Sequence, residues 1–433
     1  MGGAVYARTT PMQPPPPPKS ARTKRVLISG CGIAGPALAH FLVRQGMQPV
    51  IVEQAPRLRT EGYIIDFWGE AYRLTERMGL LPEILDAGYR VEEVRLLGAS
   101  GRKLGGFKVE VMRKATGGRF TSLQRGDLSA VLYRSIERDV EVRFGESIRA
   151  IEQTPAAVEV ELASGTREVF DFVVGADGLH SQVRALAFGP EQRYERFLDY
   201  AVAAFTVDGY QPRDPGVYAA YAEPGRQVAR FSMHDARTMF LLIVADPGAR
   251  QVDPRDVQAH KAYLRQAFQG AAWEWPQICR ALEQTPALYF DRMSQIELPA
   301  WSNGRVVLLG DAAFAPSLLA GQGSGLAIIG AYVLAGELAS TSEYGRAFQR
   351  YEALLRPFIE HKQRSARSFA GSFAPRTRIG IIARALVTRT LSIPGMAKLA
   401  MGSTLKDEVE LPDYPAHAKP AAHEPRPSAR EGV

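Results

Sequence analysis

The sequence predicts a mixed α/β fold that combines a parallel-sheet domain, an inserted and mainly antiparallel β-sheet, and C-terminal helices. The first sign is a strand, a glycine-rich turn and a helix that follow one another within residues 24–54. Two further glycine-rich turns come directly after short apolar strands, near residues 175 and 310. Between these turns, residues 197–246 hold strand-like apolar runs separated by Pro, Gly and Asp, as is typical of an antiparallel sheet.

The composition is that of a chain with a large core. Hydrophobic residues make up 46% of the 433 residues, enough for two or three domains. The net charge is +7 and comes without long Lys/Arg runs, so we expect no nucleic-acid binding. Cys31 and Cys279 have neither CxxC nor metal-ligand spacing, so we expect no disulfide framework and no bound metal. With no signal peptide visible, we expect a cytoplasmic protein that is a monomer or a homodimer.

The two ends of the chain read as disordered tails, because one is Pro-rich and the other polar. The expected division is a tail at 1–23, the dinucleotide-binding domain in three segments at 24–90, 112–190 and 296–370, sheet segments at 91–111 and 191–295, a helical segment at 371–412, and a tail at 413–433.

The strongest motif reads G-x-G-x-x-G at Gly30, Gly32 and Gly35. Around it the sequence predicts a strand, a helix and a second strand, at Val26–Ser29, Ala37–Gln45 and Pro49–Val52. The second strand ends in Glu53, 18 residues past Gly35. This context makes the glycines a Rossmann-like dinucleotide fingerprint, with an ordinary strand–helix–strand unit as the alternative.

Each glycine of this motif has a physical role. Gly30 permits the tight turn, Gly32 lets the backbone approach a pyrophosphate, and Gly35 permits close helix–strand packing. The N-terminus of the helix offers unpaired N–H groups to the anion. Glu53 would accept hydrogen bonds from an adenosine ribose, and its charge disfavours the 2′-phosphate of NADP as the resident dinucleotide.

The second and third glycine-rich turns repeat this design. A strand at Phe170–Val174 leads into Gly175-Ala176-Asp177-Gly178, and a strand at Val306–Leu309 leads into Gly310-Asp311. After Asp311, Gly, Pro and Ser are frequent as far as Gly325. A single carboxylate beside small residues is typical of backbone that approaches a ligand closely.

These three motifs, in this order, resemble the single-component FAD-dependent aromatic monooxygenases that share the para-hydroxybenzoate hydroxylase fold. The resemblance covers roughly residues 24–370 and is closest to polyketide hydroxylases and tetracycline-modifying monooxygenases. It implies bound FAD, NADPH or NADH as a transient co-substrate, and O2. The implied reaction transfers oxygen from a flavin hydroperoxide to a lipophilic aromatic or polyketide-like molecule, in secondary metabolism or antibiotic modification.

By the same resemblance, particular residues acquire roles around the cofactor. Asp311 would hydrogen-bond the ribityl chain, Arg125 would contact the flavin side chain, and Gly62 would bring backbone near the ring. Asp177 and its loop would support both flavin and nicotinamide. The full cofactor set is Gly30, Gly32, Ile33, Ala34, Gly35, Glu53, Gln54, Gly62, Arg125, Asp177, Asp311, Gly321, Gly323, Ser324 and Gly325. Phe314, where relatives commonly have His, departs from the pattern and weakens inferences about proton handling.

The inserted sheet would roof the flavin with an apolar pocket. The candidate lining residues are Phe67, Tyr218, Phe231, Met233, Phe240 and Pro316, for which the alternative is ordinary core packing. His234 is a candidate to orient or deprotonate a phenol, and its alternative is a structural or exposed role. We assign no obligate catalytic side chain, because the cofactor supplies the chemistry.

Two apolar segments invite a membrane interpretation. Within residues 312–336 we expect a helix at about Leu326–Leu338, too short to cross a bilayer and therefore buried. Residues 376–400 predict an amphipathic helix with Ile379, Ile382, Leu386 and Ile393 on one face and Arg384 opposite. We favour a helix that closes over the two domains, with peripheral membrane contact as the alternative.

Three other functions fit the same fold. A flavin-dependent halogenase would carry W-x-W-x-I-P, and this chain has the similar but reordered run from Trp273 to Ile278. A flavin reductase that acts on isoprenoid double bonds would turn over without incorporating oxygen. A flavin-binding, ligand-sequestering protein would bind flavin without oxidising NAD(P)H.

Overall fold

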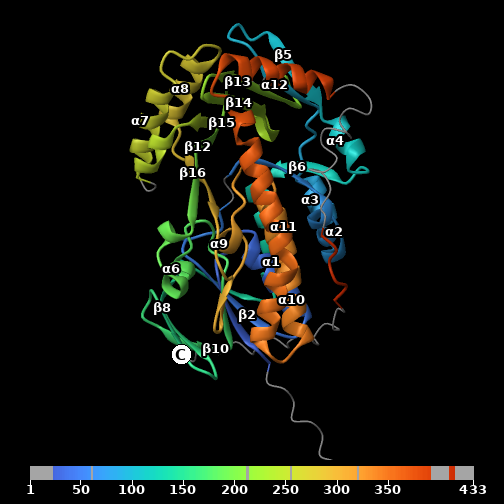
Figure 1. Cartoon of the computed structure of the whole chain (residues 1–433), viewed down its shortest axis with the longest axis vertical. Coiled ribbons are helices and arrows are strands. Elements are labelled where there is room, and N and C mark those ends of the chain that lie inside the picture. The colour runs from blue at the N-terminus through green and yellow to red at the C-terminus, as the bar shows by residue number, and fades with distance from the viewer. Residues whose placement is uncertain are drawn as a thin grey trace, which may run out of the picture.

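The computed structural model describes residues 23–59, 62–210, 214–253, 256–318, 321–391 and 409–414 (Figure 1). Most of both predicted tails lies outside these ranges, as does Ile393 of the predicted amphipathic helix. The chain forms a mixed α/β fold, with one parallel and one antiparallel sheet at its two ends (Figure 1).

The first sheet has the strand order β17-β18-β11-β1-β2-β7. Its strands are β1 Arg25–Ser29, β2 Gln48–Glu53, β7 Glu141–Phe144, β11 Phe172–Gly175, β17 Ser302–Asn303 and β18 Val306–Leu308. All neighbours pair in parallel except β17 with β18. The central strands are buried on both faces, which explains their continuous apolar runs.

Helices pack around this sheet and connect it to the rest of the chain (Figure 1). They are α1 Ala34–Arg44, α2 Gly69–Met78, α3 Leu81–Asp86, α5 Arg125–Arg134, α6 Gln182–Phe188, α9 Asp311–Phe314, α10 Gly323–Ser340 and α11 Tyr344–Phe373. A three-stranded sheet of β8 Ile148–Gln153, β9 Val158–Leu162 and β10 Arg167–Phe170 lies beside them.

Helix α10 corrects the prediction of a short helix at Leu326–Leu338. It starts at Gly323 and is long and apolar enough to span a membrane, but 72% of it is buried inside the protein. The first turn holds small residues because α2 lies against it: a Cβ on Gly325 would stand 3.3 Å from the Cβ of Ala71. Burial, and not insufficient length, therefore identifies α10 as a core helix.

The second sheet has the strand order β16-β12-β15-β14-β13-β4-β5. Its strands are β4 Glu93–Leu97, β5 Lys103–Lys108, β12 Glu195–Val207, β13 Val217–Glu223, β14 Arg226–Ser232, β15 Thr238–Ala245 and β16 Tyr289–Ile296. Helices α7 Val257–Ala267 and α8 Trp275–Gln284 pack on its outer face. The two-stranded antiparallel sheet of β3 Ile64–Trp68 and β6 Phe120–Gln124 faces the inner side, near α4 Glu110–Ala115.

Helix α11 runs from the parallel sheet to the antiparallel sheet (Figure 1). Its end packs under the antiparallel sheet, where Ala370 and Ala374 lie among Tyr200, Val202 and Ile243. Helix α12, Arg378–Thr390, follows and lies on β5, so closely that a Cβ on Gly105 would fall 2.5 Å from the carbonyl oxygen of Ala385.

The face that α12 presents to the protein is the reverse of the predicted one. Ile379, Ile382 and Leu386 are 80%, 60% and 55% exposed. Arg384 instead points inward and donates to the Gln227 side chain and to two backbone carbonyls at the end of α11. On the inward face, the small Ala385 allows close contact with β5, and Arg384 donates to the carbonyls that end α11. Because these two residues face inward, the apolar stripe lies on the outside of the helix.

The segment 409–414 packs on α10 and corrects the prediction of a tail that begins at residue 413. The Tyr414 hydroxyl donates to Glu337 at 2.7 Å, and its backbone N–H donates to the Tyr332 hydroxyl at 3.2 Å. The Tyr414 ring occupies the space left by the missing side chain of Gly336.

We predict that Gly336→Ala lowers the free energy of unfolding by about 1–3 kcal/mol. The new Cβ would stand 2.2 Å from the Tyr414 ring, so it displaces the ring and the two hydrogen bonds. Gly345→Ala in α11 meets no atom within 4 Å and provides the matched control, with no loss expected. Equal thermal unfolding of both variants and the wild type would contradict this assignment.

Candidate functional site

The three glycine-rich turns meet at one edge of the parallel sheet. A Cβ on Gly35 would lie 2.0 Å from the carbonyl oxygen of Gly30, and a Cβ on Gly30 would lie 2.4 Å from that of Ala176. A Cβ on Gly310 would lie 3.2 Å from the Cβ of Ala34. The segments near residues 30 and 176 therefore approach each other at backbone distance, and the segment near residue 310 lies against the start of α1.

Glu53 and Asp177 both fix the backbone of these turns. Glu53 accepts hydrogen bonds from the backbone N–H groups of Cys31 and Ala55, each at 2.8 Å. Asp177 accepts from the Ser181 hydroxyl and from the backbone N–H of Val183 at 3.0 Å, and burial raises the pKa of its carboxyl. The carboxylates hold the turns in shape, and Glu53 keeps further lone pairs for a ligand hydroxyl.

Ile33 and Ala34 begin helix α1 directly after the first turn. Ile33 is the N-cap residue, and no side chain caps the helix there. The first backbone N–H groups of α1 are therefore without an intrahelical partner at the point where the turns meet. Gln54 is exposed beside Glu53. This arrangement offers donors to an anionic group.

Arg125 and Asp311 carry charge without a charged partner within the described residues. A Cβ on Gly32 would lie 3.8 Å from a guanidinium nitrogen of Arg125, and a Cβ on Gly62 would lie 3.4 Å from the Cβ of Arg125. Asp311 begins α9, and a Cβ on Gly323 would lie 3.5 Å from its Oδ1. Burial raises the pKa of the Asp311 carboxyl, against the opposing effect of Arg125. Two half-buried charges thus face a space edged by glycines.

Two buried amide side chains hold the loop that follows Asp311. Gln295, on β16, donates to the carbonyl oxygen of Pro316 at 3.0 Å. Gln363, on α11, donates to the carbonyl oxygens of Ile296 and Ala315. Pro316 is thereby fixed by its backbone, and its side chain is buried.

The small residues that follow have different structural roles. Gly321 adopts a φ of +63°, which favours glycine. Gly323 and Ser324 form the first turn of α10, and Gly323 is the one that faces Asp311. Gly325 packs on α2 and turns away from Asp311, so its size is required by helix packing.

Tyr63 and Tyr289 form a wall between the two sheets. Their rings lie 5.5 Å apart, with Tyr63 beside Gly62 and Tyr289 on β16. Burial raises the pKa of both phenols, yet both side chains keep exposed surface, so they line a space enclosed by protein. The Tyr63 phenol lies within the electrostatic reach of Arg125 and Asp311, which joins this space to the two unpaired charges.

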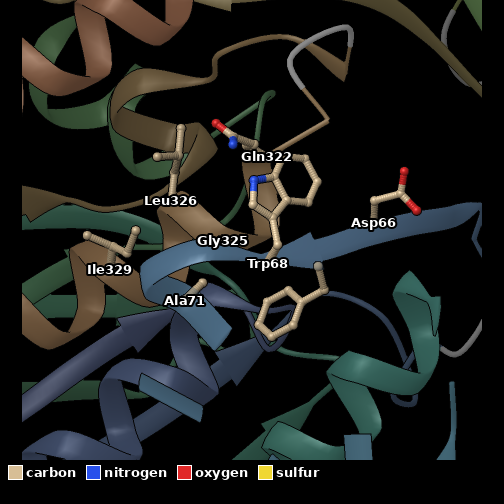
Figure 2. A pocket seen from close by; sticks show the side chains of 8 residues that line it. Asp66, Trp68, Ala71, Gln322, Gly325, Leu326 and Ile329 are labelled. Atoms are coloured by element: carbon tan, nitrogen blue, oxygen red, sulfur yellow. The ribbon is translucent and has the colours of Figure 1, made fainter. Parts of the chain in front are cut away.

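The inner face of the antiparallel sheet carries three of the predicted pocket residues. Phe231 and Met233 belong to a cluster with Tyr89, and Tyr218 packs against it. Phe67 is buried in the main core beside Tyr72 and also borders the pocket shown in Figure 2.

The prediction for Phe240 is wrong. Strand pairing places it opposite Arg230, and its ring packs on Tyr210 in the cluster beneath α7 and α8. It lies on the outer face because side chains alternate along β15, where Met239 takes the inner face. Trp273 and Trp275, of the halogenase-like run, belong to the same outer cluster.

His234 is exposed and stacks on Tyr89, with ring centroids 4.3 Å apart. It stands beside the inner-face cluster, and its charge would act on the Asp127 carboxyl. This places His234 at the edge of the pocket region without assigning it a chemical role.

Sequence reasoning missed an ionic cluster around His180. The His180 ring approaches Glu191 at 2.9 Å and Asp291 at 3.3 Å, and the fully buried Arg184 donates to Glu191 at 2.8 Å. The two carboxylates raise the pKa of His180 to about 10. Asp291 lies on β16, so the cluster joins the Asp177 turn to the antiparallel sheet. Because Asp291 lies 111 residues after His180 in the chain, the sequence contains no local pattern that predicts this cluster.

Several known proteins are similar to this chain in sequence and in fold. A family described as FAD binding domain matches residues 23–360. A flavin-dependent monooxygenase of Legionella longbeachae is 31% identical over 408 residues, covering 90% of this chain and 98% of that protein. An uncharacterized protein of Mycobacterium tuberculosis is 35% identical over 345 residues, covering 78% of this chain and 92% of that protein. The crystal structure of tetracycline destructase Tet(51) matches with a TM-score of 0.77 and 29% identity, covering 90% and 100% of the two chains.

We predict that the stabilisation given by His180 depends on pH. Its folded-state pKa of about 10 exceeds the usual 6.5, so the contribution is full below about pH 6.5 and is lost as the pH rises through about 10. The difference in unfolding temperature between the wild type and His180→Gln should shrink over that range. A difference that stays constant with pH would contradict the charged pairing.

Proposed function

The chain belongs to the FAD binding domain family and is an FAD-dependent monooxygenase, and we propose that it uses NAD(P)H and O2 to hydroxylate an aromatic or polyketide-like small molecule. The observation that carries this proposal is the convergence of three glycine-rich turns on the unpaired Arg125 and Asp311. A space edged by missing side chains and lined by one cation and one anion fits a large cofactor with both phosphate and hydroxyl groups.

The turns would hold the two halves of FAD in different ways. The first turn and the N-terminus of α1 would bind the pyrophosphate, and Glu53 the adenosine ribose. Arg125 would contact the flavin side chain and Asp311 the ribityl hydroxyls. Pro316, Gly323 and Ser324 would border the ring, where the N-terminus of α10 favours negative charge.

Bound FAD would supply electron transfer from the nicotinamide and activation of dioxygen. The chain itself positions and encloses the reactants. Tyr63 and Tyr289 would border the site, and the inner face of the sheet presents Tyr218, Phe231 and Met233. An aromatic, water-poor surface favours a planar, lipophilic substrate. The likeness to a tetracycline destructase is compatible with an antibiotic of this kind.

We predict that the purified protein binds FAD and that Arg125→Gln and Asp311→Asn each weaken this binding. Loss of one charge-assisted hydrogen bond corresponds to about 10-fold or more in the dissociation constant. Asp86→Asn, on the exposed end of α3, provides the control with unchanged affinity. Flavin absorbance after gel filtration and titration of the apoprotein measure the effect.

Oxygen labelling then separates the alternatives. With a phenolic substrate, the proposal requires NAD(P)H oxidation and one atom of ¹⁸O from labelled O2 in the product. Turnover without the label would identify a reductase, and chloride-dependent incorporation of chlorine would identify a halogenase. FAD binding without NAD(P)H oxidation under a panel of phenols would favour a ligand-sequestering protein and overturn the proposal.

We further propose that α12 contacts an anionic lipid surface, from which a lipophilic substrate would be collected. Ile379, Ile382, Leu386 and Val387 form an exposed stripe on one face of the helix. Residues 374–391 contain no acidic residue, and three of their four arginines are exposed, while Arg384 points inward. An exposed apolar stripe flanked by arginine is the pattern of an interfacial helix.

We predict that the protein sediments with vesicles of phosphatidylserine and phosphatidylcholine but not with phosphatidylcholine alone. Ile382→Glu should abolish this binding, because it places a carboxylate in the stripe. Val169→Glu, at an exposed apolar position in β10, is the control. Equal sedimentation of Ile382→Glu and the wild type would exclude α12 as the contact.

A further inference from the structure

Asp66 carries its carboxylate on the two-stranded sheet of β3 and β6, on the side that faces the larger antiparallel sheet. It lies on β3, where strand geometry turns Asp66 and Trp68 to one face and Phe67 to the other. Figure 2 shows Asp66 and Trp68 on the same side of the strand, across from Gln322 at the start of α10. Together these residues line a pocket whose far wall is formed by Leu326 and Ile329.

The Asp66 carboxylate is held in place but incompletely paired. The Ser122 hydroxyl donates to its Oδ1 at 2.6 Å, and Ser122 is buried on the facing strand. Its other oxygen has no hydrogen bond or ion pair within the described residues. Asp66 is exposed by surface area, but the protein atoms packed around the carboxyl raise its pKa.

The surroundings of Asp66 are aromatic and carry no compensating cation in the described part of the chain. The Trp68 ring stacks on Phe120, and the Asp66 charge reaches the Tyr218 phenol on the inner face of the antiparallel sheet. The indole N–H of Trp68 is also buried without a partner. A carboxylate that lies beside aromatic rings and keeps one free oxygen can accept a hydrogen bond from a donor on a ligand.

This position also connects Asp66 with the reaction space. Tyr63, directly before the same strand, lies within the electrostatic reach of Asp311 and Arg125. Tyr63 and Trp68 pack against the same cluster as Tyr218. Asp66 is therefore three residues from Tyr63, which interacts with the proposed flavin residues, and within electrostatic reach of Tyr218 on the aromatic face of the sheet.

We propose that Asp66 is a substrate-binding residue whose free oxygen accepts a hydrogen bond from a hydroxyl or protonated amine on the aromatic substrate. Ser122 fixes the carboxylate, and Trp68 and Tyr218 flank the ring that bears the donor. This selects substrates with a hydrogen-bond donor over otherwise identical rings without one. The inference rests on the proposed function and specifies its substrate class.

The test compares matched ligands on the FAD-loaded protein. The probes are 2-naphthol, its methyl ether 2-methoxynaphthalene, and 2-naphthylmethylamine, with binding measured by the change in flavin absorbance. The wild type should bind at least one donor-bearing probe about 10-fold or more tightly than the ether. Which donor is preferred distinguishes a phenol from a protonated amine as the natural group.

Asp66→Asn and Asp66→Leu should reduce this preference to about 2-fold or less, since the first removes the charge and the second the acceptor. Asp86→Asn should leave the preference intact. Unchanged flavin spectra of the Asp66 variants would show that the fold and the FAD site persist, and NAD(P)H oxidation by Asp86→Asn provides the test of the proposed function. Equal affinity of the wild type for all probes, including no binding, or a preference that survives in both variants, would overturn the role of Asp66.

Discussion

The site depends on the close approach of the backbone within the first turn and between the first and second turns, which only glycine at positions 30 and 35 permits. Gly35 faces the carbonyl of Gly30, and Gly30 faces the carbonyl of Ala176, at distances that no Cβ would tolerate. These contacts bring α1 against β1 and the second turn against the first. A side chain at either position would separate the elements whose ends form the site.

Some acidic residues of the turns stabilise the backbone, and another faces the space proposed for the ligand. Asp177 is engaged by Ser181 and Val183, and Glu53 by two backbone N–H groups, so both hold the turns. Asp311 has no such partner among the described residues and faces the same space as Arg125. The charges that remain unpaired are those that face the space, which is the condition for binding a polar cofactor.

The antiparallel sheet is held over this space by contacts from several directions. The amides of Gln295 and Gln363 connect β16 to the loop after Asp311 and to α11. The His180 cluster connects the same strand to the second turn. Strand β16 takes part in the amide contacts and in the His180 cluster. These two sets of contacts therefore hold the aromatic face of the sheet in a fixed position relative to the glycine-rich turns.

The sequence alone predicted the family and the three units of strand and glycine-rich turn that meet in the structure. These features are local: a strand, a glycine turn and a helix within about 30 residues carry their own signal. Only the tertiary structure decided which face a side chain takes. Phe240 turned outward because of its register in β15, and α12 turned its apolar face outward because Arg384 and Ala385 fit the surface beneath it. The interactions of Asp66 and His180 are with residues distant in the chain. Only packing brings these partners together, so spacing in the sequence could not predict them.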